Sequence, residues 1–139
     1  KVKAELENDM IPILCVGETE EERKEGQTEE RIGSEIRTAL FALSKEEIAK
    51  MVIAYEPIWA IGSGQAATPK DAEEIASFIR KTVKEAAGKK AADEVRILYG
   101  GSVNGDNISY FLKQKNIDGA LIGGASLKPD TMIDIYNKA

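Results

Sequence analysis

Short apolar runs alternate with longer amphipathic segments along the 139-residue chain. Four of the runs are brief and are followed by Gly or Pro, which is typical of buried strands. They predict strands at residues 11–16, 51–54, 95–99 and 120–122. Apolar residues at helical spacing predict helices that begin near residues 28, 44, 68, 107 and 129. Because strands alternate with helices, the strands are expected to run parallel, joined by right-handed crossovers.

Polar capping residues mark where these helices begin. Ser44 opens a capping-box pattern, and Thr68 is followed by Pro69 at the first helical position. Thr28 and Asn107 are expected to cap two further helices. Shorter helical stretches are expected at residues 2–6 and 19–25.

The length and the 42% hydrophobic content predict one packed domain over residues 1–139. The strands are nearly continuous in apolar residues, so both faces of the sheet are expected to be covered. The chain opens on Lys1 rather than Met, and its first helix has no start signal. We therefore expect the first residue to be a cut end.

Glu56 stands where the second predicted strand ends. Pro57 follows it and stops the strand, because proline has no N–H to donate. Four apolar residues come next in an expected loop, and Gly62 and Gly64 add backbone freedom. A carboxylate before such a segment suits a base that works under a water-excluding lid. A surface glutamate beside an ordinary loop is the alternative.

Glycines follow three successive strands, at residues 62–64, 100–102 and 123–124. Backbone N–H groups of glycines at several strand ends can approach a single anion closely. In (β/α)₈ barrels, loops after the last two strands form a phosphate site. The glycines therefore predict phosphate binding. No G-x-G-x-x-G sequence opens a helix, which argues against a dinucleotide.

Charge and composition narrow the function classes. The net charge of −5 argues against nucleic acid or an anionic membrane as the main partner. No apolar run approaches the roughly 18 residues of a membrane span. The single cysteine, Cys15, fits a reducing cytoplasm. The chain contains no histidine, which excludes His-based metal sites and Ser–His or Cys–His pairs. We expect no metal and no cofactor.

Three longer motifs resemble the triosephosphate isomerase family in order and spacing: YEPIWAIGSG at 55–64, LYGGSV at 98–103 and DGALIGGASL at 118–127. Residues 13–18 (ILCVGE) are similar to that family's fifth strand. The resemblance spans the whole chain, but it covers only the second half of the family's length of about 250 residues. It implies an α/β fold: a parallel (β/α) half-barrel of about four strands, from the family's fourth helix to its end.

The resemblance also implies roles for individual residues. Glu56 corresponds to the base that moves a proton between two carbons of a triose phosphate; a Glu base with a neutral His under a closing loop is this family's own well-known chemistry. Four residues correspond to the groups whose N–H bonds hold the phosphate: Gly62, Ser102, Gly123 and Gly124. Residues 57–67 correspond to the closing lid, which includes Pro57, Ile58, Trp59, Ala60, Ile61, Ser63 and Gly64.

Six positions complete this comparison. Tyr99 and Ser102 are implied to latch the closed lid, and Trp59 to pack on its surroundings. Cys15 corresponds to a buried cysteine near the base, for which we expect a packing role. Ser63 and Gln65 stand where the family commonly has Thr and Lys, a change that a solvent-facing loop tolerates.

The largest departure from the family concerns its other catalytic groups. The family's electrophilic His lies after its fourth strand, and its substrate-binding Asn and Lys after its first. Neither strand is among these residues. The resemblance implies an isomerase of glyceraldehyde 3-phosphate and dihydroxyacetone phosphate in glycolysis and gluconeogenesis. This chain alone is expected to be inactive, and its open edges to drive self-association or pairing with the missing N-terminal half. A non-catalytic phosphate-binding half-barrel and a folding unit without a ligand remain alternatives.

Overall fold

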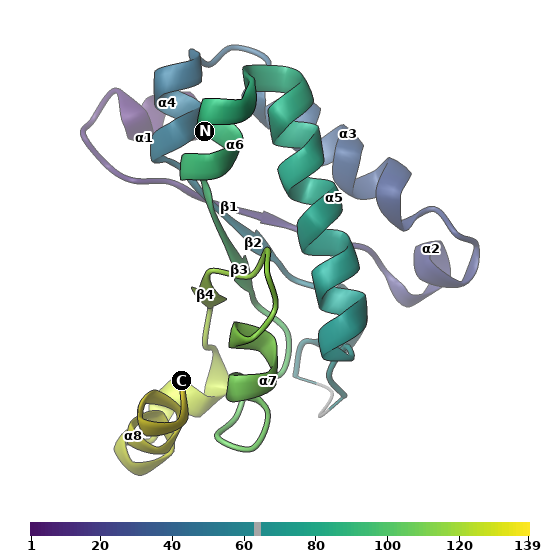
Figure 1. Ribbon diagram of the computed structural model, residues 1–139, viewed down its shortest axis with the longest axis vertical. Coiled ribbons are helices and arrows are strands. Elements are labelled where there is room, and N and C mark those ends of the chain that lie inside the picture. The colour runs from purple at the N-terminus through teal and green to yellow at the C-terminus, as the bar shows by residue number, and fades with distance from the viewer. Residues whose placement is uncertain (63–64) are drawn as a thin grey trace.

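The computed structural model describes residues 1–62 and 65–139, and its centre is a four-stranded parallel sheet (Figure 1). The strands lie in the order β1-β2-β3-β4, which is also their order along the chain. Their bounds are β1 (Ile13–Val16), β2 (Val52–Tyr55), β3 (Arg96–Tyr99) and β4 (Gly119–Ala120). A parallel sheet with helical crossovers confirms the predicted half-barrel class.

Helices connect the strands and cover one face of the sheet. The α-helices are α1 (Val2–Leu6), α2 (Glu20–Lys24), α3 (Thr28–Leu40), α4 (Lys45–Lys50), α5 (Pro69–Ala87), α6 (Lys89–Glu94), α7 (Ile108–Leu112) and α8 (Pro129–Lys138). Two short 3₁₀ turns are η1 (Ile58–Ala60) and η2 (Gly124–Leu127). In Figure 1, α3 and α5 run side by side along the sheet, and α8 projects at the far end.

The capping predictions had mixed outcomes. Ser44 forms the predicted capping box at α4, and Thr68 is the predicted cap of α5, where it also forms a capping box with Asp71. Thr28 is the first helical residue rather than the cap, because the preceding Gln27 takes that position. Asn107 does precede α7, but its side-chain oxygen accepts from the N–H of Asn104 and does not cap the helix. The side-chain amide was thus used within a turn, which competes with capping.

Two strand predictions were off by a few residues. The predicted strand at 11–16 begins only at Ile13, although the Pro12 carbonyl accepts from the N–H of Val52 at 3.0 Å. The predicted strand at 120–122 is replaced by β4 at Gly119–Ala120. Leu121 continues the pairing with one bond from its N–H to the Tyr99 carbonyl at 2.9 Å.

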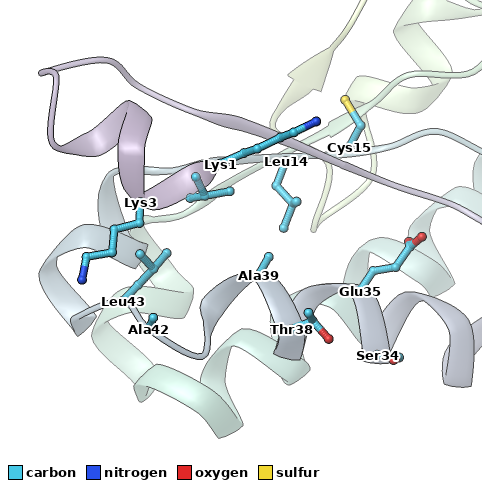
Figure 2. A pocket seen from close by; sticks show the side chains of 11 residues that line it. Lys1, Lys3, Leu14, Cys15, Ser34, Glu35, Thr38, Ala39, Ala42 and Leu43 are labelled. Atoms are coloured by element: carbon cyan, nitrogen blue, oxygen red, sulfur yellow. The ribbon is translucent and has the colours of Figure 1, made fainter.

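The expectation that both faces of the sheet are covered was wrong for β1. Val16, Tyr55 and Tyr99 share a register row and are buried. On β1, Figure 2 shows Leu14 pointing toward Ala39 of α3, while Cys15 points to the other side of the strand. Cys15 is exposed, which corrects the predicted packing role. One side of β1 therefore stays exposed, although the strand is apolar.

Candidate active site

A pocket of about 510 Å³ lies at the carboxyl ends of β2, β3 and β4. It is lined by Glu56 together with every described residue of the predicted phosphate site: Gly62, Ser102, Gly123 and Gly124. Its volume is ordinary for a small-molecule site. The predicted lid residues Ser63 and Gly64 lie outside the described residues. The structure thus places the predicted base and the predicted anion cradle at one mouth.

The backbone around Glu56 is fixed by the two neighbouring strands. Its N–H donates to the Val16 carbonyl at 2.8 Å, and the N–H of Gly100 donates to the Tyr55 carbonyl at 2.8 Å. A Cβ added at Gly100 would lie 2.6 Å from Cγ of Glu56. The absence of a side chain at Gly100 therefore makes room for the Glu56 side chain at the pocket wall.

Free space surrounds three of the glycines that line the pocket. Gly62 has a φ of 66°, a conformation that glycine adopts without strain. A Cβ added at Gly62, Gly123 or Gly124 would meet no heavy atom within 4 Å. Such accessible peptide groups suit an anion, whose oxygens need close N–H donors. Ser102 lines the same pocket, and the side-chain amide of Asn107 donates to its carbonyl at 3.0 Å.

Hydrogen bonds hold both described ends of the 57–67 segment. Near its start, the Ser102 hydroxyl donates to the Ala60 carbonyl at 2.8 Å. At its end, the N–H of Ala67 donates to the Tyr99 hydroxyl at 3.0 Å. Burial raises the pKa of the Tyr99 phenol. This keeps the phenol protonated, while its oxygen accepts from Ala67. Tyr99 and Ser102, the two predicted latch residues, therefore both contact this segment.

Glu18 is a site residue that our sequence reasoning missed. Its fully buried carboxylate accepts through one oxygen, Oε1, from the Tyr55 hydroxyl at 3.1 Å and from the indole N–H of Trp59 at 2.9 Å. The N–H of Ile58 donates to its carbonyl at 3.0 Å. Burial, with the negative charge of Glu18 beside it, raises the pKa of the Tyr55 phenol above its usual range. Glu18 thus anchors the start of the 57–67 segment.

A signal for Glu18 was present in the sequence. It follows Gly17 directly after the first strand, as Glu56 follows the second strand. Carboxyl ends of parallel strands share one edge of the sheet, so Glu18 was expected at the same edge as the segment that follows Glu56. The other oxygen of Glu18, Oε2, has no hydrogen-bond partner among the described residues.

Cys15 contacts the carboxylate of Glu56 from the neighbouring strand. Partial burial, the hydrogen bond with Glu56 and its negative charge raise the pKa of the Cys15 thiol to about 11. All three causes disfavour the thiolate. The thiol therefore stays protonated at neutral pH, although the residue is exposed.

Alkylation of Cys15 by iodoacetamide at pH 8 is expected to be roughly 100-fold slower in the folded chain than in urea, because only the thiolate reacts. The rate is expected to rise steadily as the pH approaches 11. Replacing Glu56 with Gln removes the neighbouring charge and is expected to speed the reaction. Equal alkylation rates in the folded and unfolded chains would contradict a raised pKa of the Cys15 thiol.

The part of the chain that the structure describes has neither a metal-binding cluster nor a membrane-spanning helix. Residues 1–62 and 65–139 hold no group of three or more Cys, Asp or Glu side chains that could bind a metal. Among the same residues, no helix has the length and apolar character needed to cross a membrane.

Comparison with known proteins shows the family of the chain. The family model described as triosephosphate isomerase matches residues 1–139. The triosephosphate isomerase of Dictyoglomus turgidum is 52% identical over 135 residues, which are 97% of this chain and 54% of that protein. Those of Roseiflexus sp. and Clostridium tetani are 51% and 50% identical over 137 residues, again 54% of each relative. The chain thus spans about half the length of the curated relatives that it matches. It belongs to the triosephosphate isomerase family.

Proposed function

We propose that this chain carries the base, the lid and the phosphate cradle of a triosephosphate isomerase. Such an enzyme interconverts glyceraldehyde 3-phosphate and dihydroxyacetone phosphate in the glycolysis and gluconeogenesis of the cytoplasm. The observation that carries the proposal is that Glu56 shares one pocket with Gly62, Ser102, Gly123 and Gly124. A carboxylate and an anion cradle at one mouth suit a small phosphorylated substrate.

In the proposed reaction, the Glu56 carboxylate removes a proton from the carbon next to the substrate carbonyl. The electrons of that C–H bond form the C=C bond of an enediolate, and the carbonyl oxygen takes up the negative charge. A proton also passes from the hydroxyl on the first carbon to the former carbonyl oxygen. Glu56 then returns its proton to the former carbonyl carbon, and the carbonyl re-forms on the first carbon. The glycine N–H groups fix the phosphate, and residues 57–67 exclude water, so that the intermediate is not lost to side reactions.

These 139 residues do not supply every group that the reaction needs. The negative charge of the enediolate requires an electrophile, and the sequence contains no histidine. Loss of one such electrostatic group costs about 10²–10³ in rate. The resemblance places the His, Asn and Lys of the family outside the half of its length that this chain matches. We therefore propose that the 139-residue polypeptide is nearly inactive by itself.

Apolar residues at both edges of the sheet support association with a partner. Just before β1, Ile11 is 63% exposed. A cavity of about 600 Å³ also lies between β1, α1 and α3, where Leu14 and Cys15 line it (Figure 2). Beyond β4, Leu127 is 83% exposed, and Ile133 and Tyr136 of α8 are also exposed. Such surfaces are unfavourable in water. We propose that they pair with the N-terminal half of a barrel or with a second copy of this chain.

Complementation tests this proposal. The chain would be mixed with the part of the Dictyoglomus turgidum relative that the match leaves uncovered, and turnover of glyceraldehyde 3-phosphate followed. We expect activity at least about 100-fold above that of either piece alone, since the electrophile returns. The two pieces are expected to co-sediment. A co-sedimenting but inactive pair would contradict the catalytic proposal.

The alternative is a half-barrel that binds phosphate or simply self-associates, and the exposed edges favour it. It predicts oligomers in sedimentation and weak phosphate binding at the 510 Å³ pocket without turnover in any mixture. A monodisperse monomer that binds no phosphate would exclude this alternative.

A further inference from the structure

Arg23 lies between the two ends of the proposed lid. Its Nη1 is 3.5 Å from Oε1 of Glu18, and its guanidinium carbon lies 4.9 Å from the centre of the Trp59 ring. Its Nη2 is 3.4 Å from Oδ1 of Asp71, at the start of α5. One cation on α2 thus contacts Trp59, near the start of the 57–67 segment, and Asp71, four residues beyond its end.

The two carboxylates that Arg23 contacts also accept hydrogen bonds from residues at or next to the ends of the 57–67 segment. Oε1 of Glu18 also accepts from the Trp59 indole, at 2.9 Å, so Arg23 and Trp59 share one oxygen. At the other end, Oδ2 of Asp71 accepts from the Thr68 hydroxyl at 2.8 Å, and Thr68 directly follows Ala67. Displacing either end changes the surroundings of the same guanidinium.

We propose that Arg23 is a positioning residue that couples the two ends of the 57–67 segment, so that they move together. The proposal rests on the proposed function, in which this segment is a lid. A guanidinium is planar and presents its donors in fixed directions, so turning it toward one carboxylate turns it away from the other. Loss of the Trp59 contact at the start is thereby transmitted to Asp71 at the end.

The magnitudes favour coupling over a purely stabilising role. The ion pairs of Arg23 are long, and its side chain is 32% exposed, so each pair by itself contributes little. The contact with the Trp59 ring is of similar strength. Weak contacts that share one group can exchange at small energetic cost. A rigid strut would instead need short, buried bonds.

A double-mutant cycle read through tryptophan fluorescence tests this inference without turnover. Trp59 is the single tryptophan of the sequence, so its quenching by acrylamide reports on the start of the segment alone. Asp71→Asn removes the charge at the other end and keeps an oxygen for Thr68. With Arg23 present, this change is expected to alter the quenching constant of Trp59 by roughly two- to threefold. In an Arg23→Met background it is expected to have no effect.

Two results would overturn the coupling: a Trp59 signal unmoved by Asp71→Asn, or the same shift in both backgrounds. Arg31→Met is the matched control, because Arg31 also contacts two carboxylates, those of Glu22 and Glu35. It is expected to leave Trp59 unchanged. Arg23→Lys keeps the charge without the planar fork, and is expected to retain only part of the effect.

Hydrogen exchange gives a second readout from the other end. The amide of Ala67, which donates to Tyr99, is expected to exchange roughly two- to fivefold faster in Arg23→Met than in Arg31→Met. Equal exchange in the two variants would contradict the coupling. Neither readout depends on catalysis, so a chain that fails complementation can still pass this test, and the reverse also holds.

Discussion

Replacing Glu56 with Gln is expected to lower kcat of the complemented enzyme by about 10²–10⁴, the usual contribution of a positioned general base. Gln has nearly the same shape as Glu, but its amide does not accept the substrate proton at neutral pH. KM is expected to change little, because the cradle at Gly62, Ser102, Gly123 and Gly124 is untouched. Initial rates with glyceraldehyde 3-phosphate, at matched concentrations of the paired chains, measure the effect.

The control for this prediction is Glu85→Gln on the exposed face of α5, where Glu85 forms an ion pair with Lys81. It removes the same charge far from the pocket in sequence, and is expected to leave kcat within about twofold, since exposed ion pairs contribute little. Comparable urea midpoints for both variants would show that the loss in Glu56→Gln is chemical. A Glu56→Gln enzyme with unchanged kcat would place the base elsewhere.

Local signals were sufficient for most of the fold. The capping boxes at Ser44 and Thr68 form within four residues, so short sequence patterns predict them reliably. Helix α6 was not predicted, because it begins directly after Gly88 and presents only two alanines to the core. Thr28 was wrongly assigned as a cap, and Asn107 takes the predicted cap position but makes no capping bond with its side chain, because neighbouring backbone groups decide such contacts and composition does not.

Only part of the candidate site could be predicted from the sequence. The residues of the pocket could be named from motifs, because strand-end glycines and a strand-end carboxylate leave a clear pattern. The contacts of Glu18 Oε1 could not be predicted in this way. Tyr55, Trp59 and Arg23 reach this oxygen from separate segments of the chain. The exposure of Cys15 was also missed, because burial of a strand face depends on what packs against it rather than on the strand's own sequence.

Gly17→Ala is expected to destabilise the fold by at least about 2–3 kcal/mol, the upper range for adding a methyl group to a packed interior. An added Cβ would lie 1.9 Å from the Glu56 carbonyl oxygen and 2.6 Å from its carbon, so backbone rather than a flexible side chain must move. That movement strains the 2.8 Å bond from the Glu56 N–H to the Val16 carbonyl, which fixes the base. Urea denaturation followed by circular dichroism measures the change.

Gly100→Ala is the matched comparison for this prediction. Its added Cβ would meet Cγ of Glu56 at 2.6 Å, and that side chain can rotate away. We expect a stability loss below about 1 kcal/mol, since a rotamer change is cheaper than a backbone shift. The base would nevertheless be displaced, and a displacement of about 1 Å is enough to lower the rate of the complemented enzyme about 100-fold. If Gly17→Ala unfolded at the same urea concentration as Gly100→Ala, the close approach of β1 and β2 at Glu56 would not be what fixes the base. The contrast therefore separates the residue that holds the site together from the residue that only makes room within it.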